Sequence, residues 1–360
     1  MIPSVLATEI QASITDFLKT EFRSSSPGFE GLIDNFLYDP DNPDKPNPIF
    51  KGPYLSASLP FRSGTAGADY FPDVPMAFAP HRHQEQAFER LQHPNYQSTI
   101  VATGTGSGKT ECFMMPILDH CFKYRGEPGI KAILVYPMNA LATDQAKRLA
   151  QLIWHNDNLK GYVTAGLFVG ESEREPTSVM TETGVITSKD ILRQSPPDIL
   201  LTNYKMLDYL LIRPKDQGLW LGNNPETLRY LVVDEIHTFD GAQGTDLACL
   251  IRRLKARLQT PVNHLACVGT SATLGGEVRA VRAMRSESFR EPPLLSYAGK
   301  IFNETFDRNA IVTEDRLSAA EFLADAFIDP QPVPSPDLLD SLLPQNYDSV
   351  EKYIRAQYQL

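Results

Sequence analysis

The sequence predicts an α/β fold in which helices cover both faces of a mainly parallel sheet, forming a three-layer sandwich. Between His81 and about Arg285, short apolar runs alternate with runs of helical periodicity, which is typical of repeated βαβ units. A glycine-rich loop, Thr103–Thr110 (TGTGSGKT), follows the first apolar run, and a later apolar run ends in Asp234 and Glu235. Both features fall at the carboxyl ends of expected strands, where such sheets bind ligands.

The apolar and helical runs of this stretch can be placed in order. The expected strands are Ser98–Ala102, Ala132–Tyr136, Tyr162–Phe168, Asp198–Leu201, Tyr230–Val233 and Leu265–Gly269. The expected helices are Arg82–Leu91, Lys109–Phe122, Ala140–Ile153, Tyr204–Leu211, Gly244–Leu258 and Gly276–Arg285. The basic side chains of Arg252, Arg253, Lys255 and Arg257 lie off the apolar stripe of their helix and are expected to form a solvated face.

Composition divides the chain into three predicted parts. Residues 1–80 form an N-terminal extension, with an amphipathic helix over Val5–Phe22 followed by a Pro-rich irregular segment that has one short extended piece near Tyr54–Phe61. Residues 81–290 form the nucleotide-binding domain. Residues 291–360 are Pro-rich and acidic and are predicted to be a linker, with a weakly helical end at Tyr347–Tyr358.

Bulk properties exclude several classes of protein. The formal charge of −10 argues against coating nucleic acid by charge alone, although it leaves room for a narrow basic groove. The four cysteines contain no C-x-x-C pair, so we expect free thiols in a reducing cytoplasm and no zinc site. No run approaches 18 apolar residues and no signal sequence is present, which predicts a cytoplasmic protein without a membrane partner.

The glycine-rich loop has the chemistry of a phosphate-binding P-loop. Its backbone N–H groups can turn inward onto phosphate oxygens, Lys109 can reach the β- and γ-phosphates, and the Thr110 hydroxyl can hold Mg²⁺. Thr103 stands where the strict pattern has its first glycine, but Gly104, Gly106 and Gly108 keep the loop flexible. A flexible turn is the alternative, and the strand before and helix after the loop argue against it.

The acidic pair is the second half of a nucleoside-triphosphate site. Asp234 is placed to bind Mg²⁺ through its water shell, and Glu235 is placed to activate the attacking water. The alternative, a solvated helix start, fits poorly because the buried-strand pattern Leu231–Val233 leads directly into the two carboxylates.

Six segments, in this order, resemble motifs Q, I, Ia, Ib, II and III of superfamily 2 DEAD/DEAH-box helicases. They are HRHQEQAF (His81–Phe88), the loop, YPMNALATDQ (Tyr136–Gln145), LLTNYKML (Leu200–Leu207), DEIH (Asp234–His237) and GTSATL (Gly269–Leu274). The resemblance implies the RecA-like P-loop NTPase fold for this lobe, and ATP with Mg²⁺ as its ligands. The predicted ATP-binding residues are Gln84, Thr103, Gly104, Thr105, Gly106, Ser107, Gly108, Lys109 and Thr110.

The segment Asp234–Leu254 (DEIHTFDGAQGTDLACLIRRL) resembles the sequence that follows motif II in large multidomain helicases. These are the RecQ-like repair helicases and relatives in anti-phage systems such as DISARM and Druantia. This resemblance implies an ATP-dependent DNA translocase in defence or repair, and it favours DNA over RNA. Motifs IV to VI are missing after Leu274, so a second RecA-like lobe is expected from a longer chain or a partner subunit.

The resemblance also assigns roles. Gln84 would read the adenine edge, and the catalytic set would be Lys109, Asp234, Glu235 and His237. His237 would link the γ-phosphate site to Ser271, Ala272 and Thr273, unless it is only a satisfied surface histidine. The residues implied to hold nucleic-acid phosphates are Pro137, Asn139, Ala140, Thr202 and Asn203, for which ordinary helix capping is the alternative.

Two other functions remain open at this level. A P-loop adaptor without catalysis, docking nucleic acid or a protein partner, is disfavoured by the retained Lys109, Asp234 and Glu235. A transporter-type or kinase P-loop protein is disfavoured because no LSGGQ-like signature is present.

Overall fold

The computed structural model describes residues 3–23, 26, 28, 58–65, 69–76, 78–170, 175–272, 293–324, 348–349 and 352–353. The chain divides into two compact units, residues 1–59 and 60–360. In the first unit, α1 (Pro3–Glu21) confirms the predicted amphipathic helix. Its apolar side chains Ile10, Ile14 and Phe17 are exposed, Phe17 to 60%.

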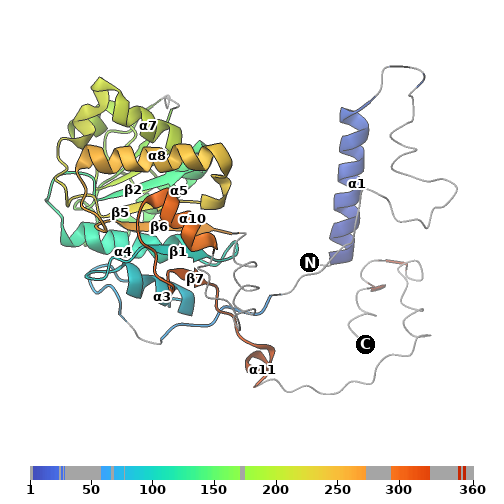
Figure 1. The fold of residues 1–360 in the computed structure, drawn as a ribbon. Coiled ribbons are helices and arrows are strands. Elements are labelled where there is room, and N and C mark those ends of the chain that lie inside the picture. Colours follow the sequence, from blue (N-terminus) through green and yellow to red (C-terminus); the bar gives the residue numbers. More distant parts are fainter. Residues whose placement is uncertain are drawn as a thin grey trace. The chain divides into compact units, whose positions relative to one another are not determined.

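The second unit is built on a seven-stranded sheet whose described strand pairs are all parallel (Figure 1). The spatial order is β3-β4-β2-β5-β6-β1-β7. The strands are β1 (Thr99–Ala102), β2 (Ala132–Tyr136), β3 (Ala165–Phe168), β4 (Ile199–Asn203), β5 (Tyr230–Val233), β6 (Ala266–Ser271) and β7 (Ile311–Thr313). The α/β three-layer prediction is therefore confirmed.

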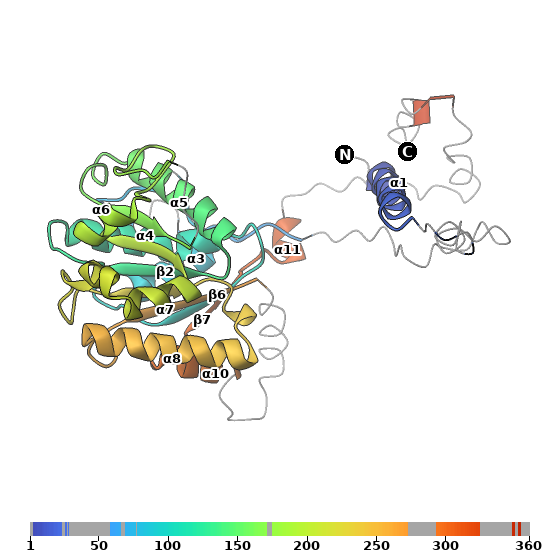
Figure 2. The same ribbon diagram turned by 90° about the horizontal axis from the view of Figure 1, so that it is seen from above.

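Helices cover both faces of this sheet, as Figure 2 shows from above. On one face lie α3 (Arg82–Leu91), α4 (Lys109–Lys123) and α5 (Asn139–Trp154). On the other lie α7 (Tyr204–Ile212), α8 (Gly241–Leu258) and α10 (Pro293–Phe302). Short elements complete the unit: α6 (Lys189–Gln194), α11 (Ala319–Phe322) and the 3-10 turns η2 (Pro214–Trp220) and η3 (Ile236–Thr238).

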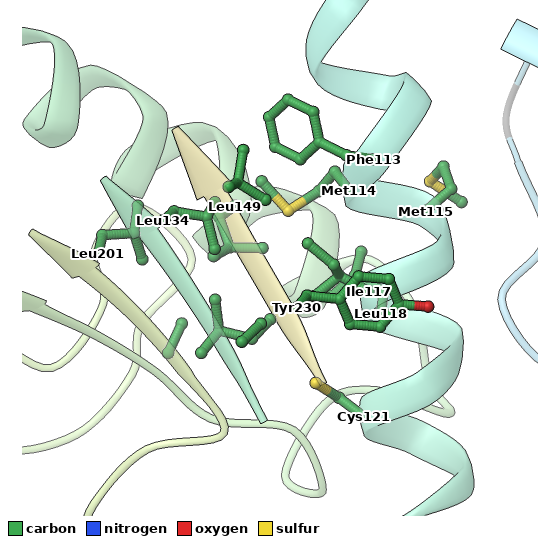
Figure 3. Packing of buried hydrophobic residues seen from close by; sticks show 14 of the residues in the cluster. Phe113, Met114, Met115, Ile117, Leu118, Cys121, Leu134, Leu149, Leu201 and Tyr230 are labelled. Carbon is green, nitrogen blue, oxygen red and sulfur yellow. The ribbon is translucent and has the colours of Figure 1, made fainter. Parts of the chain in front are cut away.

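Strand periodicity divides the core into two layers. In β1, Val101 packs with the layer of α3, α4 and α5, while Ile100 and Ala102 pack with the opposite layer. Figure 3 shows the first layer, where Met114 and Ile117 of α4 face strand residues such as Leu134. Because every strand is buried on both faces, the strands appear in the sequence as continuous apolar runs.

The six predicted strands are all present, with boundaries shifted by up to three residues. The seventh, β7, was missed, since it falls in the part expected to be a linker. It pairs with β1 through Val101 and Val312, so residues 311–313 complete the sheet. A strand of three residues is too short to show a period in sequence. The bounds of the predicted domains otherwise stay a prediction.

The basic run of α8 also corrects an expectation. Lys255 is not solvated: its side chain is 11% exposed, and Nζ pairs with Glu304 Oε1 at 2.6 Å and donates to the Phe302 carbonyl at 2.6 Å. Arg252 donates to the Lys300 carbonyl at 2.9 Å. These cations hold the carboxyl end of α10, where helix carbonyls lack partners.

Several predictions lie wholly or partly outside the described residues: the helix Gly276–Arg285, Thr273, half of the extended piece Tyr54–Phe61, and most of the end segment Tyr347–Tyr358. In the part of the chain that is described, no helix has both the length and the apolar character needed to cross a bilayer.

Candidate nucleotide-binding site

The predicted phosphate loop and acidic pair meet at one edge of the sheet. All seven strands run the same way, so their carboxyl ends share an edge. The order β5-β6-β1 places the end of β6 between the loop that follows β1 and the acids that follow β5. Residues from three separate segments therefore line one site.

The backbone of the phosphate loop depends on its glycines. Gly106 and Gly108 have φ of 75° and 77°, in the left-handed region that other residues adopt at a cost. The Ser107 hydroxyl donates to Thr103 Oγ1 at 2.7 Å, and both side chains are buried. The departure at Thr103 therefore has a structural role, because its hydroxyl closes the loop from inside.

Lys109 begins α4 and reaches across the site to the acidic pair. Its Nζ lies 3.2 Å from Glu235 Oε1. The two side chains remain 15% and 25% exposed, so the pair is open to a ligand. The ammonium and the carboxylate are thus close enough to contact one nucleotide.

The end of β6 holds the acidic pair in place. The Thr270 hydroxyl donates to Asp234 Oδ1 and accepts from Glu235 N at 3.1 Å. The Ala272 N–H donates to Glu235 Oε2 at 3.2 Å. Burial raises the pKa of the Asp234 carboxyl, and the Thr270 hydrogen bond opposes that rise.

His237 lies between the acids and β6. Its Nδ1 is 3.0 Å from Ser271 Oγ and 3.4 Å from Glu235 Oε2. The structure therefore brings together His237, Ser271 and Ala272, as the predicted coupling set requires, while Thr273 lies outside the described residues.

Gln84 is directed at the loop and makes two bonds within the protein. Its Oε1 accepts from His81 N at 2.8 Å, closing a capping box at the start of α3, and its Nε2 donates to the Gly108 carbonyl at 3.1 Å. The neighbouring His83 places Nε2 2.8 Å from the Ser107 carbonyl. Adenine recognition by Gln84 would use the second N–H of its amide and the second lone pair of its carbonyl oxygen, which these two bonds leave available.

Two contacts at the site were missed in the sequence. Thr270 lies inside the GTSATL segment, where only the following residues carried a role. Glu314, just after β7, accepts from Gly104 N at 3.3 Å and from Arg316 at 3.3 Å. No sequence signal marks Glu314, because its approach depends on the pairing of β7 with β1.

The predicted nucleic-acid residues lie at the ends of β2 and β4, which are adjacent strands. Asn203 Nδ2 donates to Asn139 Oδ1 at 2.6 Å, while Asn203 Oδ1 caps α7 by accepting from Met206 N at 2.7 Å. The Thr202 hydroxyl is buried and donates to the Phe168 carbonyl at 2.7 Å. Pro137 and Ala140 flank Asn139 at the same turn, partly or fully exposed.

The oxygen atoms near Lys109, on Thr110 and Asp234, fit a Mg²⁺ ion that would take its other ligands from phosphates and water. Mg²⁺ prefers oxygen ligands and commonly takes only one or two from the protein. The Thr110 hydroxyl makes no hydrogen bond within the described residues, and Asp234 uses only Oδ1 for a side-chain bond there. No described group of three or more His, Cys, Asp or Glu side chains is arranged to hold a metal by itself.

Comparison with known proteins identifies relatives of this chain. Residues 81–281 match the family model of the DEAD/DEAH box helicases. The chain is 28% identical over 291 residues to Druantia protein DruE of Escherichia coli, covering 54% of this chain and 16% of DruE. It is 28% identical over 252 residues to the uncharacterized ATP-dependent helicase YprA of Bacillus subtilis, covering 67% of this chain and 30% of YprA.

Among solved structures, the DUF1998 helicase MrfA bound to DNA superposes with a TM-score of 0.49 and 21% identity, covering 72% of this chain and 31% of that chain. The chain thus spans less than a third of the length of each of these three proteins.

Proposed function

Because this chain belongs to the DEAD/DEAH box helicase family, we propose that it binds and hydrolyses ATP with Mg²⁺ as one lobe of a nucleic-acid-dependent motor. The observation that carries the proposal is the 3.2 Å approach of Lys109 Nζ to Glu235 Oε1 across the carboxyl edge. An ammonium that meets a carboxylate beside a P-loop can neutralise phosphate charge on one side while the acid orients water on the other.

Each residue then has a role. Backbone N–H groups of Thr105–Thr110 and the Lys109 ammonium bind the phosphates. Glu235 accepts the proton of the attacking water. Thr110 and Asp234 would hold Mg²⁺, which when bound neutralises developing charge on the phosphate oxygens. His237, bonded to Ser271, passes the state of this site to the rest of the lobe.

We propose DNA as the nucleic acid, and defence against phage or DNA repair as the setting. DruE is named a Druantia protein and MrfA was solved with DNA, which supports both choices. The linked Asn139 and Asn203 would contact backbone phosphates at the ends of β2 and β4. A second RecA-like lobe, from a longer chain or a partner, would complete the side of the ATP site where Lys109 and Glu235 are partly exposed.

The test is ATP binding and hydrolysis by this chain, with and without single-stranded DNA. Lys109→Ala should remove binding of a fluorescent ATP analogue and all turnover. Lys123→Ala is the matched control, because Lys123 lies on the same helix, is 42% exposed and pairs only with Asp119 among the described residues. Unchanged binding in Lys109→Ala would contradict the proposal and favour a non-catalytic adaptor.

A further inference from the structure

Thr270 lies inside the GTSATL segment, but the roles implied by that segment begin only at Ser271. It lies in β6, one residue beyond the register pair Val233–Gly269, so it stands beside Asp234 at the end of β5. Thr270 is fully buried. Its one hydroxyl contacts both members of the acidic pair, through Asp234 Oδ1 and Glu235 N.

The direction of these two bonds follows from chemistry. A carboxylate only accepts and a backbone N–H only donates, so the hydroxyl hydrogen goes to Asp234 and a lone pair receives the Glu235 N–H. Glu235 needs this support, because its φ of 47° is in the left-handed region that is costly for a residue with a side chain.

The neighbours of Thr270 do not duplicate this contact. Ser271 bonds His237, and the Ala272 N–H bonds Glu235 Oε2. Among the described residues, Thr270 is the one whose side chain bonds the Asp234 carboxylate. By occupying Oδ1, it leaves Oδ2 for a metal and its water shell.

We propose that Thr270 is a positioning residue, which orients Asp234 toward Mg²⁺ and fixes the backbone from which Glu235 reaches the water. This inference rests on the proposed function, since it concerns how the same site acquires its metal. It predicts that loss of the hydroxyl weakens the contribution of Mg²⁺ to nucleotide binding, while nucleotide binding without metal stays intact.

The test measures the affinity for a fluorescent ATP analogue in Mg²⁺ and in EDTA. The ratio of the affinity in Mg²⁺ to the affinity in EDTA is the metal-dependent gain in nucleotide affinity. Thr270→Val keeps the side-chain shape and should reduce the gain roughly tenfold, the size expected when a hydrogen bond to a charged group is lost. Affinity in EDTA should not change, which also verifies that the variant is folded. Thr270→Ser retains the hydroxyl and should restore most of the gain.

Two comparisons complete the design. Thr238→Val is the matched control, because its exposed hydroxyl bonds the Glu235 carbonyl at 2.8 Å and does not touch Asp234. In an Asp234→Asn background, Thr270→Val should lower the gain little further, because the two residues act as one unit. A wild-type gain in Thr270→Val, or additive losses in the double variant, would overturn the role of Thr270. If the wild-type chain shows no metal-dependent gain, the proposed function fails as well.

Discussion

Two lysine–carboxylate pairs lie at opposite edges of the same sheet. They differ in how deeply their side chains are buried and in how many further hydrogen bonds they make to the protein. At the carboxyl edge, Lys109 and Glu235 are 3.2 Å apart with side chains 15% and 25% exposed. At the amino edge, Lys131 and Asp198 are 2.6 Å apart with side chains 2% and 12% exposed. The chemistry is the same, but the surroundings are not.

In the amino-edge pair, two of the three donors of the Lys131 ammonium and both carboxylate oxygens of Asp198 are bonded within the protein. Lys131 Nζ also donates to the Glu127 carbonyl at 2.7 Å, and Asp198 Oδ2 accepts from both the N–H and the hydroxyl of Thr164, at 2.7 and 2.8 Å. These bonds join the residues just before three strands: Lys131 before β2, Asp198 before β4 and Thr164 before β3. The closed pair therefore serves the fold, whereas the open pair keeps charge available for a substrate.

The largest expected effect is on the open pair. Glu235→Gln should lower ATP turnover about 10³-fold, because the amide cannot take the proton of the attacking water. Affinity for ATP and the melting temperature should stay close to wild type. Steady-state assays measure ATP turnover, fluorescent-nucleotide binding measures the affinity, and thermal unfolding measures the melting temperature. Glu127→Gln, an exposed carboxylate at the amino edge, is the control and should hydrolyse ATP normally.

Breaking the closed pair should change stability instead. Asp198→Ala leaves Lys131 buried without a counter-charge, so the free energy of unfolding should fall by about 3–5 kcal/mol. Urea unfolding measures this loss. Asp190→Ala removes a carboxylate that is 83% exposed and pairs with Arg193, and it should cost at most about 0.5 kcal/mol. Equal losses in the two variants would remove the distinction between the edges.

Lowering the pH should reduce the free energy of unfolding, because His120 is buried near the amino edge of the sheet. Burial, with the nearby charges of Arg229 and Lys131, lowers the pKa of His120 to about 3. The unfolded chain then binds a proton that the folded chain does not, so stability present above pH 6.5 is lost as the pH falls toward 3. The loss at pH 5 is on the order of 2 kcal/mol.

Unfolding in urea at pH 7 and pH 5 measures this effect. His120→Gln should show a smaller difference between the two pH values than the wild-type chain. The variant also loses part of the contact between Tyr96 and His120, so its stability at pH 7 serves as its own reference. An unchanged pH difference would assign the acid sensitivity to other groups.

The smallest expected effect concerns the joined asparagines. Asn203→Ala should cost about 1 kcal/mol of stability, because it removes the N-cap of α7, whereas Asn139→Ala should cost less. Both should weaken binding of labelled single-stranded DNA a few-fold in fluorescence anisotropy. If Asn139→Ala binds as tightly as wild type, the turn is only structural.

Much of this site could be predicted from sequence because its parts are local. A glycine loop between a strand and a helix, and an apolar run ending in two acids, need only neighbouring residues to be recognised. Thr270, Glu314 and β7 escaped prediction because each acquires its role from a segment distant in the chain. Of the four basic side chains expected on a solvated face of α8, Arg252, Arg253 and Arg257 are exposed. The expectation was wrong for Lys255 for the same reason, since residues 302–304 return to cover it.

The α/β class, six of the strands and the edge where the loop and the acids lie were all predictable from residue order, because periodicity and glycine placement act within a few residues. The hydroxyl that holds Asp234 and the identity of the closed lysine–carboxylate pair became known from the folded chain. Hydrogen-bond partners and burial depend on what packs alongside, and that is set by strand order.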